Sequence, residues 1–400
     1  MSIDIYFTPR FQPLIEIAYA SCASSGRTDL TKPFVESFPS GFLTEKAKFD
    51  AALEEEEHLS LGELGAKLVT SMAYNDGAQE IQVLHANLAN ASATLRRIHA
   101  RLQPLLLFFI DAASLIDQDD PNWDILLAVE KSSSENAGGM PPRILGFATL
   151  YNFWVFPDRQ RMRTSQVLVL PPYQGTGVGN LLVESAYKIA DERNVIDITM
   201  EDPTEDMQRL RDRIDLQRML QLTWTHEAVL GALNRVLEDV GKGPATQNGQ
   251  AIRNQLKASA ELLQHLRKDL RLSRQQAKRM WESLLYKVAL DLGTDAIAAV
   301  EKFLHSTLES QVLEAKQESQ DKKMITTEGQ GFMLFKQKSK YNGFKNASAD
   351  QTTLPVEEMS EEKQKAALLE AVNERIEELN RLCCPSRGLD RGEEDGGEEE

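Results

Sequence analysis

A glycine-rich turn is the stretch of this 400-residue sequence whose residue types are best suited to holding a ligand. An apolar run precedes the turn and a helical pattern follows it, so the first amide N–H groups of that helix have no partner within the helix. Glycines let the backbone approach a ligand closely, and the positive end of a helix dipole suits a phosphate or pyrophosphate. The residues that would supply these amides are Gln174, Gly175, Thr176, Gly177, Val178, Gly179 and Asn180.

The spacing of the glycines narrows the choice of ligand. A nucleoside triphosphate loop requires Lys followed by Ser or Thr after its last glycine, and here Asn180-Leu181 stands there. A dinucleotide fingerprint requires G-x-G-x-x-G, whereas this turn reads G-x-G-x-G. Close packing of a strand against a helix is the alternative explanation for three glycines.

Two carboxylates, Glu201 and Asp202, follow the next strand pattern, Val195–Met200. Asp202 has a structural explanation, because Asp202-Pro203-Thr204-Glu205 has the pattern of a helix N-cap, first position and capping box. Glu201 has none beyond that of a surface residue. A lysine ammonium, with a reference pKa of about 10.4, gains a lone pair only by losing a proton. A partly desolvated Glu201 is suited to accept that proton directly or through one water.

The elements around these residues follow from periodicity. Gln166–Leu170 is apolar on both faces, which is typical of a buried central strand, and Pro171-Pro172 ends it. Upstream, the sequence predicts a helix over Ala91–Ile116 with a kink at Pro104. The further predicted strands are Glu80–Leu88, Asp124–Glu130 and Ile144–Phe156. Arg159, Arg161 and Arg163 are expected as solvated charges in a hairpin turn.

Several ordered motifs now support a resemblance. The turn Gln174-x-x-Gly177-x-Gly179 resembles the acetyl-coenzyme A signature of the GNAT superfamily of N-acetyltransferases. SQVLVLPPYQGTGVG, DITMEDPTED and LRDRIDLQ, with FFIDAASLIDQDDPNWDILLAVEK and TLYNFWVFPD upstream, are similar to motifs of the type B histone acetyltransferase catalytic subunits. The resemblance is close from about Pro104 to Leu220, diverged before that and thin beyond it.

The resemblance implies the fold and the cofactor. The expected fold class is α+β: a GNAT-type mixed, mainly antiparallel sheet flanked by helices, with a small N-terminal α/β region and a helical C-terminal region. The cosubstrate would be acetyl-CoA, with no metal. Its pantetheine arm and thioester carbonyl would meet backbone groups of Val167, Leu168 and Val169. Thr204 and Arg213 would also contact the coenzyme, and Arg213 would supply the positive charge that its phosphate groups need.

The resemblance also implies substrate contacts. Tyr151, Asn152 and Phe153 would line the histone peptide groove, although such aromatic alternation is also typical of a core. Asp111 would assist near the substrate lysine, with an ion-paired carboxylate at the helix edge as the alternative. Asp111 is one methylene shorter than the Glu usual in the family, and Thr204 replaces its Asn or Ser.

The N-terminal region begins abruptly. Ile3–Phe7 and Pro13–Ala20 have the pattern of a hairpin that, by resemblance, belongs to the family's histone-recognition domain. The acidic Phe-Gly-Glu loop and the Gly-Tyr-Lys segment of the family do not precede it. We therefore expect a truncated chain, in which peptide recognition is the first property placed in question.

Composition argues against several classes of function. The net charge of −16 does not suit a protein that grips nucleic acid, and it favours cationic partners such as histone tails. The three cysteines, Cys22, Cys383 and Cys384, form no disulfide framework, and the histidines show no zinc spacing. No apolar run is long enough to span a membrane.

The sequence as a whole predicts four regions: 1–90 for histone recognition, 91–220 as the acetyl-CoA-binding domain, 221–384 as a helical region and 385–400 as an acidic disordered tail. The predicted function is direct transfer of acetyl to lysine on the N-terminal tail of newly made histone H4, with Glu201 as general base supported by Asp202 and Asp111. The alternatives are a GNAT enzyme with another amine substrate and a catalytically impaired histone-binding subunit. Expected partners are histone H4, or H3–H4, and a WD-repeat histone-binding subunit, in nucleus and cytoplasm.

Overall fold

The computed structural model of the chain describes residues 2–19, 30–56, 61–74, 79–110, 113–132, 143–240, 248–327 and 361–384. Its contacts divide the chain into two units. The first comprises Met1–Ile214 with Arg267–Ser273, and the second Asp215–Leu266 with Arg274–Glu400. The chain thus returns to the first unit for one short segment after it has entered the second.

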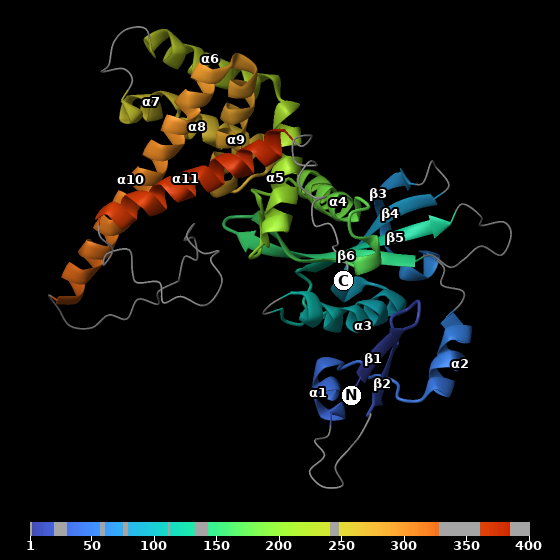
Figure 1. The fold of residues 1–400 in the computed structure, drawn as a ribbon. Helices are drawn as coiled ribbons and strands as arrows, with labels where there is room; N and C mark the ends of the chain where they lie inside the picture. Colours follow the sequence, from blue (N-terminus) through green and yellow to red (C-terminus); the bar gives the residue numbers. More distant parts are fainter. Residues whose placement is uncertain are drawn as a thin grey trace, which may run out of the picture. The chain divides into compact units, whose positions relative to one another are not determined.

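The first unit contains two sheets and five helices within the described residues (Figure 1). Its elements are β1 (Ser2–Phe7), β2 (Pro13–Ala18), α1 (Thr31–Ser37), α2 (Lys46–Glu56), β3 (Lys67–Tyr74), β4 (Gln79–Asn87), α3 (Ala93–Phe109), β5 (Trp123–Ser132), β6 (Arg143–Val155), β7 (Arg159–Val169), α4 (Val178–Glu192), β8 (Ile198–Met200) and the first part of α5 (Glu205–Leu220).

The main sheet has six strands in the order β3-β4-β5-β6-β7-β8. Every neighbouring pair is antiparallel except β7 and β8, which run parallel because α4 connects them. The predicted mixed, mainly antiparallel sheet is therefore confirmed, as is the predicted N-terminal hairpin, in which β1 pairs with β2. β7 is the last strand but one, so the expected central position of Gln166–Leu170 was wrong.

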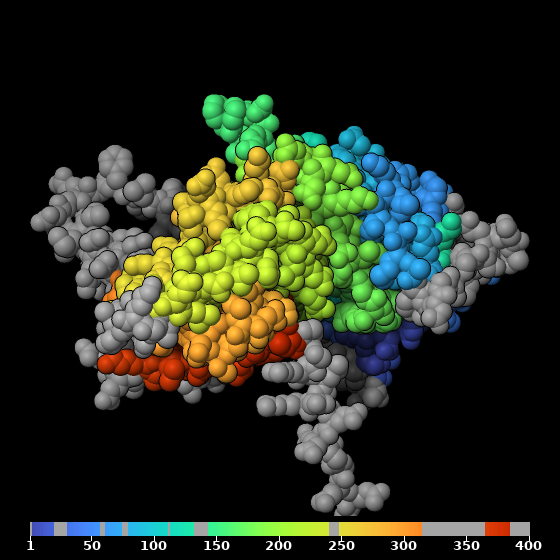
Figure 2. All heavy atoms as spheres, turned by 90° about the horizontal axis from the view of Figure 1, so that it is seen from above, coloured from blue at the N-terminus to red at the C-terminus, as the bar shows by residue number. Residues whose placement is uncertain are grey.

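Helices cover both faces of this sheet, with α3 on one side and α4 on the other (Figure 1). The α3 face forms one apolar cluster whose members come from the helix and from alternate positions of the strands: Leu95, Ile98, Leu102, Ile125, Leu127, Phe147 and Leu168. On the other face α4 buries Leu182, Ala186 and Ile189, and it lies directly beside β3, as the neighbouring green and blue atoms of Figure 2 show. The two packed faces fix β7 from both sides.

Three sequence expectations change in detail. The helix predicted over Ala91–Ile116 ends at Phe109, with Pro104 inside it. β7 begins at Arg159, so the arginines expected in a turn lie in a strand, where two of them find carboxylate partners. β8 is only three residues long, although Val195–Met200 was expected to be extended, because Ile196 and Asp197 are used in loop contacts before the ladder starts.

The second unit is helical, which confirms the predicted helical C-terminal region. Besides the last part of α5 it contains α6 (Thr223–Val240), α7 (Gly249–Leu256), most of α8 (Ala260–Leu270), α9 (Arg274–Leu292), α10 (Thr294–Thr327) and α11 (Glu361–Cys383). No helix among the described residues is long and apolar enough to cross a membrane. The predicted tail, 385–400, lies outside the described residues, and the predicted region boundaries stay predictions.

Candidate active site

The parallel pair β7 and β8 stays together for only three residues. Met162, Arg163 and Thr164 pair with Ile198, Thr199 and Met200, and the backbone N–H of Glu201 then donates to the carbonyl oxygen of Thr164 at 2.9 Å. β7 continues to Val169 after β8 has ended. The strand edge between Ser165 and Val169, about 13 Å long at the usual rise per residue, is thus left without a neighbouring strand among the described residues.

A bulge in β7 determines which of its backbone N–H and C=O groups point outward at this open edge. The register between β6 and β7 shifts at Thr149/Leu150, opposite Ser165. Beyond the bulge, the N–H of Leu170 donates to Leu145 of β6, so by alternation the N–H and C=O groups of Val169 and Val167 point away from β6. Of the three residues predicted to offer backbone groups to a ligand, Val167 and Val169 therefore have those groups on the open edge, while Leu168 is buried against α3.

The glycine turn stands at the far end of the same edge. Gly175 and Gly177 have φ angles of 75° and 91°, which only glycine adopts without cost, and Gly177 is the N-cap of α4. The first intrahelical bond runs from Leu181 N–H to Gly177 C=O, and no side chain caps the helix. The amides of Val178, Gly179 and Asn180 are consequently free of helical partners and suit a phosphate.

Gln174 connects the turn to the edge. Its Nε2 donates to the carbonyl oxygen of Val169 at 3.0 Å, while Thr176 Oγ1 donates to the carbonyl oxygen of Tyr173 at 2.6 Å. These two side chains fix the turn from within.

Glu201 lies where the two strands part. Its Oε2 accepts a short hydrogen bond from Ser165 Oγ and lies 3.3 Å from Arg163 Nη2. The Arg163 guanidinium carbon lies 4.9 Å from the centre of the Phe153 ring. Glu201 therefore stands on the same side of the sheet as Arg163 and Phe153, with a side chain that is 39% exposed.

An aromatic row leads to this carboxylate. The ring centres of Trp123 and Tyr151 are 4.6 Å apart and those of Tyr151 and Phe153 are 4.7 Å apart. Asn152, between the last two, points to the opposite face, where its Nδ2 donates to Asp124 Oδ2 at 2.8 Å and its Oδ1 accepts from Arg193. The structure thus brings Tyr151 and Phe153 toward Glu201, and Asn152 into a separate polar cluster.

That cluster is built around a buried charge. Burial would raise the pKa of Asp124, but hydrogen bonds with His85, Arg193 and Asn152 and the charge of Arg193 outweigh it and lower the pKa to about 2. Arg193 follows the last residue of α4, so the ionised Asp124 ties the end of that helix to the sheet.

The residues after Glu201 differ from the predicted helix start. Asp202 has a φ of 33°, and the chain turns there. The cap of α5 is Thr204, whose carbonyl accepts from Gln208 N–H and whose Oγ1 accepts from Met207 N–H at 3.3 Å. The predicted N-cap role of Asp202 was therefore wrong, because the helix begins two residues later than Pro203.

Arg213 lies on α5, the helix that reaches the glycine turn through Leu210. Leu210, one turn before it on the same helix face, approaches within 3.5 Å of the position that a side chain on Gly179 would occupy. The Arg213 side chain is exposed and has no ion-pair partner among the described residues.

Asp111 lies outside the described residues. The chain that follows it is attached to α3 and to the sheet: Ile116 N–H donates to Gln103 Oε1 of α3 at 2.6 Å, and Gln166 Nε2 of β7 donates to the Ser114 carbonyl at 2.8 Å.

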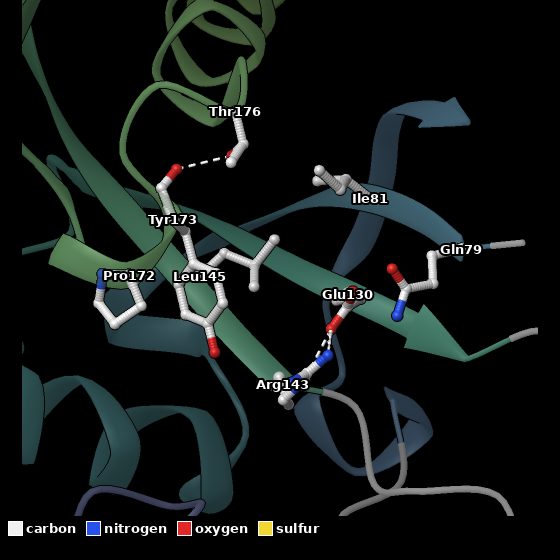
Figure 3. Close-up of a pocket in the computed structure, with 8 residues that line it drawn as sticks. All are labelled: Gln79, Ile81, Glu130, Arg143, Leu145, Pro172, Tyr173 and Thr176. Carbon is white, nitrogen blue, oxygen red and sulfur yellow. Dashed lines mark hydrogen bonds and ion pairs between the residues drawn. The ribbon is translucent and has the colours of Figure 1, made fainter. Parts of the chain in front are cut away.

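A cavity of about 250 Å³ adjoins the glycine turn on the side of β5 and β6 (Figure 3). The sticks of Tyr173 and Thr176 border it above, and an ion pair between Arg143 and the buried Glu130 borders it below. It holds none of Glu201, Ser165 or Arg163. In the described ranges no cluster of three His, Cys, Asp or Glu side chains is arranged to hold a metal ion.

Sequence reasoning missed Ser165, Arg163 and Asp197. Asp197 is buried and pairs with Arg161 at 2.5 Å and with Arg267 at 3.4 Å, which holds the loop before β8. The alternation of Arg161, Met162 and Arg163 was a signal that β7 starts before its apolar run. Nothing local indicated Arg267, which is 70 residues away from its partner.

Comparison with known proteins now adds the family. Residues 113–212, which hold the parting strands and the glycine turn, match the model of the "Acetyltransferase (GNAT) family", and residues 1–111 match "Histone acetyl transferase HAT1 N-terminus". In fold and in sequence, this part of the chain is thus similar to acetyltransferase domains of the GNAT family.

Relatives narrow the assignment. The chain is 28% identical over 290 residues to the "Histone acetyltransferase type B catalytic subunit" of Zea mays, covering 72% of this chain and 59% of that protein. It is 29% identical over 300 residues to that of Arabidopsis thaliana (74% and 61%) and 32% identical over 216 residues to that of Homo sapiens (52% and 50%). The chain is thus similar to type B histone acetyltransferase catalytic subunits, and it spans about 60% of the length of the two plant proteins.

Proposed function

We propose that the chain transfers the acetyl group of acetyl-CoA to lysine on the N-terminal tail of newly made histone H4. The observation that carries the proposal is the position of Glu201, a carboxylate at the point where β7 and β8 part, at one end of a strand edge whose other end is the glycine turn. The similarity to these two family models and to the type B histone acetyltransferase catalytic subunits supports the coenzyme and the class of acceptor.

The residues present fit the coenzyme. The amides of Val178, Gly179 and Asn180, together with Arg213, would hold its pyrophosphate, and the exposed edge of Val167 and Val169 would pair with the amides of its pantetheine arm. Thr204 stands at the start of α5 as a further contact. Acetyl-CoA would supply an activated thioester. As the new C–N bond forms, the C–S bond breaks and CoA leaves as its thiolate, which takes up the second proton that the amine loses.

The chain's own groups perform the proton transfer. Glu201 takes a proton from the substrate ammonium, so that the amine nitrogen has a lone pair for the thioester carbon. Backbone N–H groups on the β7 edge stabilise the charge that develops on the carbonyl oxygen. Tyr151 and Phe153 provide an aromatic surface for the aliphatic stem of the lysine. Asp202 and Asp111 stay proposed helpers, and a WD-repeat subunit stays a proposed partner in cytoplasm and nucleus.

The test is an acetylation assay with purified full-length protein and three conditions: an H4 tail peptide, spermidine and no acceptor. We expect turnover that depends on the H4 peptide. Glu201→Gln should lower kcat by about 10²–10⁴, the usual contribution of a general base, without loss of acetyl-CoA binding. Glu184→Gln, a change at an exposed glutamate of α4, is the matched control.

Other outcomes would favour the alternatives. Turnover with spermidine alone would indicate a GNAT enzyme with another amine substrate. Tight binding of the peptide without turnover would indicate a histone-binding subunit. Full activity of Glu201→Gln would refute its role as the base.

A further inference from the structure

The Glu201 carboxylate is held through only one of its two oxygens. Ser165 Oγ donates to Oε2 and Arg163 Nη2 lies 3.3 Å from it, and no hydrogen bond to Oε1 is found among the described residues. A carboxylate fixed in this way has one oxygen engaged by two donors and the other available as a proton acceptor.

The two donors come from β7, the strand that also forms the exposed edge. Ser165 lies at the bulge, where the register between β6 and β7 shifts. In a regular strand, successive side chains alternate between the two faces of the sheet. The bulge interrupts this alternation at Ser165 and so changes the direction of its side chain. The Ser165 hydroxyl thereby reaches the carboxylate of Glu201, the residue that directly follows β8.

The position of Arg163 is fixed by an aromatic ring. Its guanidinium carbon lies 4.9 Å from the Phe153 ring centre, and its Nε is buried without a hydrogen-bond partner in the described part of the chain. Stacking on Phe153 and one contact with Glu201 therefore determine where the charge stands. The same arginine connects the aromatic row to the carboxylate.

We infer that Ser165 and Arg163 are positioning residues for the acetyl transfer: they orient Glu201 so that Oε1 faces the incoming amine. This inference rests on the proposed function and extends it to two residues with no assigned role. A general base must lie within hydrogen-bond reach of the proton it accepts, and freedom of its carboxylate to rotate lowers the fraction of time in that geometry.

The expected effect is a fall in kcat with little change in KM. Ser165→Ala and Arg163→Gln should each lower kcat for H4-dependent turnover by about tenfold, which is less than the 10²–10⁴ that removal of a general base itself costs. The KM for acetyl-CoA should stay within about twofold, because neither side chain lies in the glycine turn. Arg163→Lys keeps the positive charge and should recover most of the lost rate.

A matched control separates position from charge. Arg159→Gln removes the same charge from the same strand, four residues away, where the side chain is exposed at the hairpin end of β7. It should leave kcat and KM unchanged.

The decisive measurement is a double-mutant cycle. If the two residues act through Glu201, then adding Ser165→Ala or Arg163→Gln to Glu201→Gln should cause no further fall in kcat. A merely structural role would reduce the residual rate again. The inference would be overturned if Ser165→Ala or Arg163→Gln lowered kcat by the same factor in the wild type and in Glu201→Gln. It would also be overturned if both single variants kept the wild-type kcat. Either result would leave the proposed function intact. Absence of H4-dependent turnover in the wild type, or full activity of Glu201→Gln, would instead remove the proposed function and this inference together.

Discussion

The backbone N–H of Glu201 and the carbonyl oxygen of Thr164 form the last rung between β8 and β7 in the described structure, at 2.9 Å. One bond thus ends the parallel ladder and sets the carboxylate beside Ser165, the first residue of the open edge. The proposed base is consequently attached to β7, the strand whose open edge is the proposed contact for the pantetheine arm. Changes that move β7 or the loop before β8 should affect activity through this shared element.

The glycine turn gives the first prediction. Gly177 caps α4 with a φ of 91°, and alanine in the left-handed region costs about 1–2 kcal/mol. A Cβ there would meet Met72 at an ordinary 3.5 Å, so strain and not overlap is expected. Gly177→Ala should raise the KM for acetyl-CoA about tenfold, because the strain is relieved by turning the first amides of α4 away from the phosphate.

Gly41→Ala is its control. Gly41 has a similar φ of 84°, with no atom within 4 Å of the added carbon. Both variants should lose similar free energy of unfolding in urea, but only Gly177→Ala should change the KM. Equal KM values for the two variants would contradict a role of this turn in binding the coenzyme.

A second prediction concerns Asp197, which is buried between Arg161 and Arg267. Removal of one member of a buried ion pair leaves a charge without compensation and costs about 3–5 kcal/mol in typical cases. Since Arg161 is itself 45% exposed, Asp197→Asn should lower the free energy of unfolding by about 3 kcal/mol or less. Urea denaturation is the measurement. Asp206→Asn, in an exposed pair with Arg209, should change it by less than about 0.5 kcal/mol.

These contacts also explain where sequence reasoning succeeded. Hydrophobic periodicity correctly indicated β4, β5 and β6 and the N-terminal hairpin, because one buried face imposes alternation along each strand. It failed where a side chain finds its partner far away. Arg161 and Arg163 were assigned to a turn because their partners, Asp197 and Glu201, lie across a parallel connection that no local pattern reveals.

The candidate site shows the same division. The three glycines and Glu201 were identifiable, since a turn with positive φ and an unexplained carboxylate leave local signals. The return of Arg267–Ser273 to the first unit had no such signal. There the Ile198 N–H donates to the Arg271 carbonyl, and the Arg271 side chain reaches the Val195 carbonyl at 3.0 Å. Such contacts depend on tertiary packing alone.

A third prediction follows from the close approach of β6 to β7 at Gly146. A Cβ on Gly146 would lie 2.5 Å from the Leu168 carbonyl oxygen and 3.0 Å from Val169 Cα, which are backbone atoms that cannot turn aside. Gly146→Ala should therefore lower the free energy of unfolding by about 2–3 kcal/mol, within the range of overpacked sites. It should also raise the KM for acetyl-CoA, because Val169 belongs to the open edge.

The matched change is Gly231→Ala in α6. There the added carbon would meet only the end of the Arg235 side chain at 3.8 Å, and the glycine lies inside a helix. Alanine should stabilise the protein by up to about 1 kcal/mol through helix propensity. Destabilisation by both changes, at equal size, would show that the β6–β7 contact is not the cause.

The last prediction concerns acid stability and His99, which is completely buried in α3. Burial lowers the pKa of His99 to about 3 from 6.5. Gln118 Nε2 lies 2.7 Å from His99 Nδ1, and the ring lies edge-on to Phe147 at 5.9 Å. A neutral ring whose Nδ1 accepts from the amide carries its proton on Nε2, which finds no hydrogen-bond partner within the described ranges.

The sign of the pH effect follows from proton binding. Between pH 6.5 and 3 the unfolded chain binds a proton at His99 that the folded chain does not, so acidification favours unfolding. From pH 6.5 to 5 the loss is about 1.5 × 1.36, or about 2 kcal/mol. In His99→Leu this acid-induced loss of about 2 kcal/mol in the free energy of unfolding should vanish, while Gln118 keeps its hydrogen bond to the Arg96 carbonyl. Urea unfolding at pH 7 and pH 5 measures the difference. His226→Gln, at an exposed position, should retain the wild-type slope, and an unchanged slope in His99→Leu would contradict the assignment.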